Sequence, residues 1–201
     1  MIAAALSLLG AIVVAAVIAR IPGLRRPGAT AALGALTVAL LLAAALCARA
    51  AGSVTGAAQV AAYALTVAAA ALSADVIVRT VFDVGMVRRR ASATPPADRE
   101  ASNAASTDDA AGATGTDDSA DAGRPGPLRG GLAIGVLERT AVTAAVLAGW
   151  PGGIAVVLAV KGLARYPELR EPDASEQFII GTFTSVLFSL AVAGVGIMLV
   201  R

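Results

Sequence analysis

The sequence predicts an all-α fold, a polytopic transmembrane helical bundle of about six membrane helices. Of its 201 residues, 57% are hydrophobic and only 15% are charged, and the mean hydropathy is +0.78. A soluble domain carries roughly 25% charged residues, so this composition favours a chain that is solvated by lipid. Because unpaired backbone groups in hydrocarbon cost several kcal/mol each, the segments inside the membrane are expected to be helices.

Four apolar stretches are long enough to cross a membrane unaided. A hydrocarbon core of about 30 Å requires roughly 20 helical residues. The four stretches are residues 2–19, 30–48, 57–78 and 178–200. No Lys or Arg precedes the first of them, so we expect a retained helix there rather than a cleaved secretory signal.

Two further apolar stretches, residues 132–150 and 152–164, are interrupted by charged residues and joined by a Pro-Gly-Gly breaker. They predict a helical hairpin. An alternative is a re-entrant hairpin, because each arm has only about 10 residues between Arg139 and Lys161, which is too short to span. In that case the charges lie at the inner interface and Trp150 points into the bilayer.

The chain divides into three parts. Residues 1–90 form an N-terminal three-helix segment and residues 131–201 a C-terminal one. Between them, residues 91–130 consist mainly of Ala, Ser, Thr, Asp, Gly and Pro. Such a composition buries too little apolar surface to offset its ordering entropy, so we expect a disordered linker.

The basic residues predict the orientation. With the N-terminus outside, nearly every Lys and Arg falls on cytoplasmic connections and only Arg49 and Arg201 lie outside. Both termini are therefore expected outside and the linker in the cytoplasm. The Arg-dominated, Ala-rich composition is typical of a high-GC bacterium, so the expected location is a bacterial plasma membrane.

Three consecutive basic residues, Arg88, Arg89 and Arg90, precede the linker. At the cytoplasmic surface each gains about 1 kcal/mol from anionic lipid headgroups. No aromatic platform accompanies them and the linker that follows is acidic, so a nucleic-acid partner is not expected.

Four charged residues of the predicted hairpin, Glu138, Arg139, Lys161 and Arg165, form a candidate intramembrane polar cluster. Lys161 and Arg165 are spaced i, i+4 and repel each other unless an anion lies beside them. The candidate anions are Glu138, Glu168, a lipid phosphate and a bound substrate. The alternative is that these charges mark the cytoplasmic ends of two helices and extend to the headgroups.

A second charged pattern lies where the third predicted helix leaves the membrane. Asp75, Arg79 and Asp83 are spaced i, i+4, i+8, which predicts an interfacial salt-bridge ladder along one helix. If Asp75 instead points into the bundle, it is a candidate proton or cation site.

Two faces of small residues are candidate helix-packing sites. One carries Gly131 and Gly135, and the other carries Gly181, Ser185 and Ser189. Small residues allow helices to approach closely. These faces are expected to pack against each other or across a dimer.

Three runs in the second half carry a resemblance to a known group of proteins. They read IGVLER at 134–139, KGLARYPEL at 161–169 and SEQFIIGT at 175–182. Over roughly residues 130–200 the chain resembles a family of uncharacterised bacterial polytopic integral membrane proteins. The resemblance implies that Glu138, Arg139, Lys161, Arg165 and Gly181 are family features. It implies no activity.

The composition argues against an enzyme. The chain has no His and a single Cys, Cys47, so it lacks the usual general base and any thiolate metal site. No cofactor or metal is expected. The leading hypothesis is a non-enzymatic assembly or scaffold component that associates with itself or with another membrane protein. The alternative is a small transporter or channel that uses the polar cluster.

Overall fold

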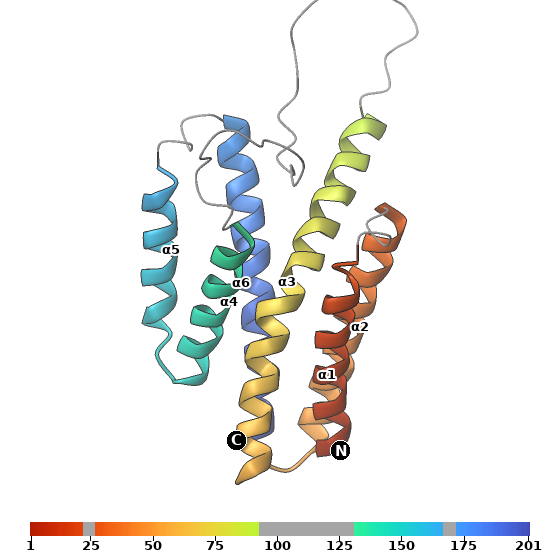
Figure 1. Cartoon of the computed structure of the whole chain (residues 1–201), viewed down its shortest axis with the longest axis vertical. Helices are drawn as coiled ribbons and strands as arrows, with labels where there is room; N and C mark the ends of the chain where they lie inside the picture. Colours follow the sequence, from red (N-terminus) through yellow and green to blue (C-terminus); the bar gives the residue numbers. More distant parts are fainter. Residues whose placement is uncertain (22–26, 93–130, 167–171) are drawn as a thin grey trace, which may run out of the picture.

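The computed structural model describes the backbone of residues 1–21, 27–92, 131–166 and 172–201, and the side chains of residues 1–21, 28–85, 132–166 and 175–201. Within these ranges the chain is all-helical, which confirms the predicted all-α class (Figure 1). The six helices are α1 (Ile2–Ile18), α2 (Pro27–Ala50), α3 (Ala57–Ser92), α4 (Gly131–Leu147), α5 (Gly152–Ala164) and α6 (Pro172–Val200). The predicted linker, from residue 93 onward, lies outside the described residues.

Three of these helices are long and apolar enough to cross a membrane, over Gly28–Ala50, Ala57–Gly85 and Ser175–Val200. Helix α1, with 17 residues, and α5, with 13, are shorter. At 1.5 Å per residue α5 is only about 20 Å long, less than the hydrocarbon thickness of about 30 Å. The turn between α4 and α5 accordingly stops short of the end of the bundle where the two termini lie (Figure 1).

Helix α3 is the one element that extends far beyond the apolar stretch that predicts it. The apolar run ends near residue 78, whereas the helix continues to Ser92. The charged residues that end the apolar run are compatible with a helix, and no proline follows that run before Pro95. Hydropathy therefore locates the apolar part of α3 but not the residue at which the helix ends.

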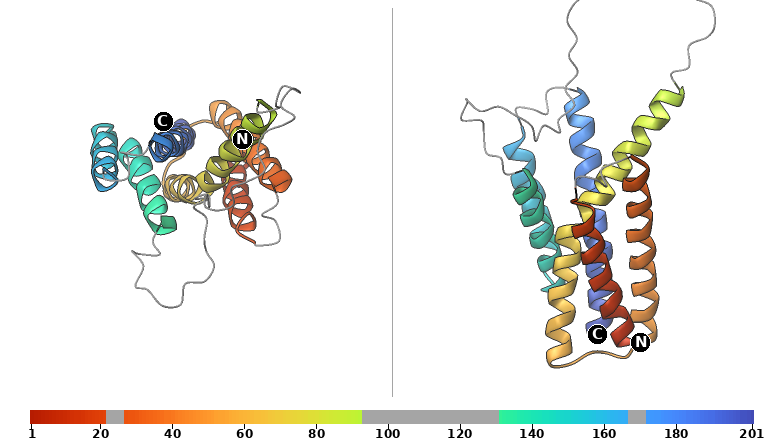
Figure 2. Two further views of the ribbon diagram at one scale, coloured as in Figure 1. Left: turned by 90° about the horizontal axis from the view of Figure 1, so that it is seen from above. Right: turned by 45° about the vertical axis from the view of Figure 1, so that its right-hand side comes forward.

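The hydrophobic core is built by α1, α2, α3 and α6 (Figure 2). Its buried members include Leu9, Leu41, Ala70 and Val192, and none comes from α4 or α5. Alanine dominates the core, so the helices approach closely with little side-chain volume between them. The chain is thus a four-helix body with the α4–α5 hairpin on one side.

Helices α3 and α6 approach each other closely within this body. A Cβ placed on Gly196 would lie 2.6 Å from the Thr66 hydroxyl oxygen, so only glycine fits there. Thr66 is fully buried and donates its hydroxyl hydrogen to the Ala62 carbonyl at 2.7 Å, which satisfies its polar group within its own helix. At the same end, the Val54 N–H donates to the Leu199 carbonyl at 2.9 Å and ties the α2–α3 loop to α6.

The α4–α5 turn closes with a helix-ending motif. The Gly149 N–H donates to the Val146 carbonyl at 3.0 Å, and the Trp150 N–H donates to the Ala145 carbonyl at 2.8 Å. Gly149 has a φ of +72°, the left-handed conformation that this Schellman motif requires. Pro151 then precedes α5, where its missing N–H costs no helical hydrogen bond.

Large apolar side chains are exposed on all six helices. Examples away from the helix ends are Leu42 and Leu187, each more than 60% exposed. Exposed apolar surface of this extent is unfavourable in water and marks a membrane or protein interaction surface.

Replacing Gly196 with alanine should destabilise the four-helix body, whereas the same replacement at Gly194 should not. Gly196→Ala inserts a methyl group against Thr66, and overpacking of this kind costs about 1–3 kcal/mol. Gly194 lies on the same helix, but a Cβ added to it would meet no atom within 4 Å, so Gly194→Ala should be neutral or slightly stabilising. Thermal unfolding of both variants in detergent tests this; equal melting temperatures would contradict the α3–α6 contact.

Candidate functional site: a polar pocket beside α3, α4, α5 and α6

A partly open pocket of about 390 Å³ is lined by residues of α3, α4, α5 and α6, together with Arg165 just after α5. Its charged lining residues are Asp75, Glu138, Arg139, Lys161 and Arg165. The structure therefore brings the four residues of the candidate polar cluster together, and adds Asp75 from the first half of the chain.

Arg139 is the most buried charged residue of the pocket. It is 4% exposed, and its Nη1 donates to Oδ1 of Asp75 at 2.8 Å. Burying a charge is costly unless the charge is paired and hydrogen-bonded. This ion pair supplies the partner and links α4 directly to α3.

Lys161 forms the second ion pair of the pocket, with Glu138. This pair joins the two arms of the hairpin, α5 and α4. The Lys161 ammonium also lies 5.8 Å from the centroid of the Phe178 ring on α6, within the range of a cation–π contact. Of the anions considered for Lys161, Glu138 contacts it, whereas Glu168 lies outside the described residues.

The salt-bridge ladder predicted along α3 is wrong for the described residues. Asp75 pairs with Arg139 of α4, and Asp83 accepts a hydrogen bond of 2.7 Å from the Thr30 hydroxyl of α2. In this part of the chain no ion pair joins Arg79 to either carboxylate. The spacing alone predicts a local ladder, but both carboxylates face neighbouring helices instead.

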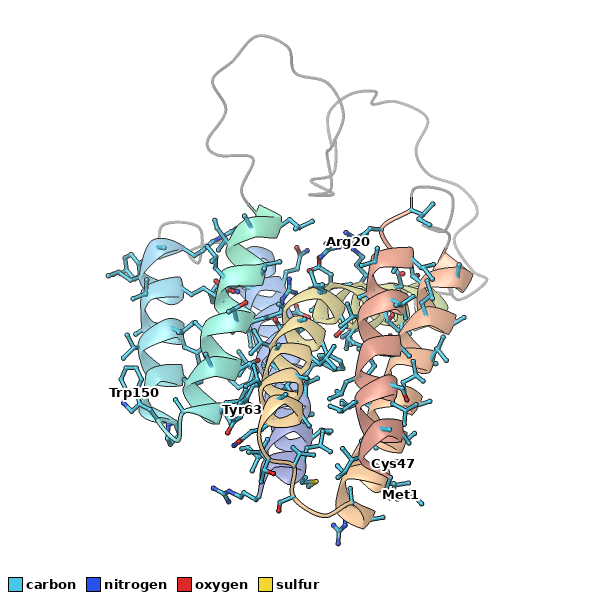
Figure 3. The ribbon with its side chains drawn as sticks, turned by 60° about the horizontal axis from the view of Figure 1, so that its bottom comes forward. Met1, Arg20, Cys47, Tyr63 and Trp150 are labelled. Carbon is cyan, nitrogen blue, oxygen red and sulfur yellow. The ribbon has the colours of Figure 1, made fainter. Side chains whose placement is uncertain are left out.

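Asp75 also borders a second, much smaller cavity of about 20 Å³, shared with Arg20, Thr30 and Arg79. The Nε and Nη2 atoms of Arg20 are buried without a hydrogen-bond partner among the described residues. Figure 3 shows Arg20 at the end of α1 opposite the N-terminus. Asp75 therefore lies between Arg139 on one side and the Arg20 cavity on the other.

The small-residue faces are used within the chain. A Cβ on Gly181 would lie 3.6 Å from the Phe82 ring, an ordinary van der Waals contact, so α6 packs against α3 at this position without requiring a glycine. Ser189 is fully buried and donates to the Ser185 carbonyl at 2.8 Å, while Ser185 itself lines the pocket. These contacts leave little of the predicted face for a dimer.

Gly135 has a different role from the one expected of a packing glycine. A Cβ there would lie 3.1 Å from Nη2 of Arg139, one turn further along α4. The missing side chain therefore makes room for the guanidinium of Arg139 rather than for another helix. Gly131 is the first residue of α4, and its surroundings lie outside the described side chains.

Two further predictions concern basic residues and metal ligands. Residues 88–90 belong to α3, but the side chains of Arg88, Arg89 and Arg90 lie outside the described ones. Their expected contact with anionic headgroups stays a prediction. Among the residues that the structure does describe, no group of three or more His, Cys, Asp or Glu side chains gathers in a way that could hold a metal ion.

Several pocket residues are not predicted by the sequence patterns. Phe82, Gln177 and Thr182 line the pocket, and Thr182 is only 8% exposed. Thr182 ends the run SEQFIIGT, on which the expected resemblance rests, but Gln177 is not among the residues that the resemblance marks. Phe82 has no signal in the sequence, because its place opposite Gly181 depends on how α3 and α6 are rotated.

Comparison with protein-family models, with curated proteins and with solved structures finds no match to this chain. The resemblance of residues 130–200 to a bacterial membrane protein family therefore stays an expectation.

Removing only Asp75 from the Arg139–Asp75 pair should destabilise the protein more than removing both residues. Asp75→Leu leaves a buried guanidinium without its carboxylate, which is expected to lower the free energy of unfolding by about 3 kcal/mol. The double variant Asp75→Leu/Arg139→Leu should regain a large part of that loss, since no uncompensated charge remains. Denaturation in mixed micelles measures both. Additive losses would show that the two residues are not coupled.

Proposed function

We propose that this chain is an integral membrane protein of a bacterial plasma membrane, in which α1, α2, α3 and α6 span the bilayer. The length and apolar composition of α2, α3 and α6 support this arrangement. The exposed apolar side chains on every helix support it as well. Helix α1, with 17 residues, is at the lower limit for a span.

In this proposal the α4–α5 hairpin is re-entrant and enters from the cytoplasmic side. The 13 residues of α5 are too few to cross, and Trp150 at the hairpin tip is 62% exposed, where it would face the bilayer (Figure 3). Both termini lie at one end of the bundle, which agrees with the orientation that the basic residues predict, with the termini outside and the linker in the cytoplasm.

Reporter fusions test this topology. A fusion at Ser106, in the linker, should report the cytoplasm, and fusions at Gly52 and Arg201 should both report the outside. Gly52 is an exposed residue of the α2–α3 loop and is a control that does not depend on how the hairpin enters. If Ser106 and Arg201 reported the same compartment, the proposed topology would be wrong.

The proposed activity is that of a small transporter or channel, which admits a polar solute to the pocket. The observation that carries this proposal is the buried Arg139–Asp75 pair beside a cavity of about 390 Å³. Ionisable residues at membrane depth usually face a substrate or ion pathway and seldom have a purely structural role. A volume of this size lies within the range of small-molecule sites.

The contacts favour this activity over a scaffold role. The small residues Gly181 and Ser189, which were expected to form a docking face, pack within the chain instead, whereas the charged residues gather at the pocket. An enzymatic role has no support from the pocket either, because its carboxylates are engaged in ion pairs and no Cys or Lys nucleophile stands free beside them. This last statement concerns the described side chains only.

Accessibility of a pocket cysteine tests for transport. In a Cys47→Ala background, Ser185→Cys places one thiol in the pocket. A transporter that alternates its access should let a membrane-impermeant thiosulfonate label this thiol from either side of oriented vesicles. Ser189→Cys, one turn away on α6 and fully buried, is the matched control and should react slowly from both sides. Labelling of Ser185→Cys from one side only would refute alternating access.

A further inference from the structure

We propose that the pocket binds an oxyanion, a carboxylate or phosphate group, through the side edge of the Arg139 guanidinium. This inference rests on the proposed function, because it names the chemical class of the solute that the same pocket admits. It starts from an imbalance between hydrogen-bond donors and acceptors in the described part of the pocket.

The first observation is that half of the Arg139 guanidinium has no partner. Nη1 is bonded to Asp75, but Nε and Nη2 are buried and make no hydrogen bond to any described residue. A buried donor that lacks a partner costs about 1–3 kcal/mol, and more when the group is charged. In a side chain that is only 5% exposed, this cost calls for a partner outside the chain.

The second observation is the geometry of these two atoms. The N–H bonds of Nε and Nη2 point in parallel from one edge of the planar guanidinium. That edge matches the two oxygens of a carboxylate or a phosphate in a bidentate pair. A neutral solute with a single acceptor would satisfy only one of them.

The third observation is that the two described carboxylates of the pocket are already paired. Asp75 and Glu138 accept from Arg139 and Lys161 respectively. The side chains of Gln177, Thr182 and Ser185 also line the pocket, and each can donate a hydrogen bond to an anion. An oxyanion would meet these donors, whereas a cation would have to compete with two existing ion pairs.

Access to the free edge requires a movement of the side chain. Nε and Nη2 have almost no surface open to water in this state, so an incoming oxyanion meets them only if the guanidinium swings toward the cavity that Arg139 lines. Gly135 leaves the space beside Nη2 free of a side chain. Rotation about the last bonds of the Arg side chain is therefore not blocked from within α4.

Binding measurements on the purified full chain test the inference. Maltoside micelles contain no phosphate or carboxylate, so they leave the site free of competitors. Calorimetric titration uses acetate, inorganic phosphate and short-chain phosphatidylglycerol as separate probes. We expect saturable binding of at least one probe, weakened about tenfold or more in Arg139→Lys, which keeps the charge beside Asp75 but lacks the planar fork. If only phosphatidylglycerol bound, the oxyanion would be that of a lipid headgroup. If acetate or phosphate bound, the oxyanion would be that of a free solute.

Arg49→Lys is the matched control. Arg49 is exposed in the last turn of α2 and does not line the pocket, so this variant should bind like the wild type. Absence of saturable binding of every probe, or equal affinities of wild type and Arg139→Lys, would overturn the inference. The cysteine assay needs no ligand, so the two proposals can fail separately. Two-sided labelling without oxyanion binding would indicate transport of another class of solute. Oxyanion binding with one-sided labelling would indicate a binding site without transport.

Discussion

The ion pair between Arg139 and Asp75 is the constraint on which the arrangement of the hairpin depends. The hydrophobic core is confined to α1, α2, α3 and α6, so α4 does not join the body through that core. Helix α4 buries Val142 and Thr143 and also contributes a guanidinium that is almost fully buried against a carboxylate of α3. Unlike apolar packing, which is non-directional, such a pair fixes both the depth and the rotation of α4.

The packing does not follow the order of the chain. The sequence places three helices before the linker and three after it, yet α6 belongs to the core of the first three. Gly196 against Thr66 and the bond from Val54 to Leu199 hold α6 to α3 and to the α2–α3 loop. The α4–α5 hairpin therefore packs against both α3, from the first half of the chain, and α6, which follows it in sequence.

Hydropathy locates all six helices, because each contains an apolar run of helical length and the connections between them contain Pro or Gly. It does not predict which residues meet. These helices are apolar nearly all round and rich in alanine, so no stripe reveals the inward face. Local spacing assigns Asp75 to Arg79, whereas its partner is 64 residues away. The gathering of Glu138, Arg139 and Lys161 is predictable because the Pro-Gly-Gly turn pairs the two arms of the hairpin.

The shortness of α5 and the polar pocket have one physical explanation. In the proposed topology, a hairpin that ends inside the bilayer would displace lipid beside α3 and α6 without needing apolar residues along its whole length. Charged groups at that depth are tolerated only where they face protein or a cavity, and Lys161, Glu138 and Arg139 all do so. The pocket that these residues line is partly open, which gives a solute access to the cavity that Arg139 borders.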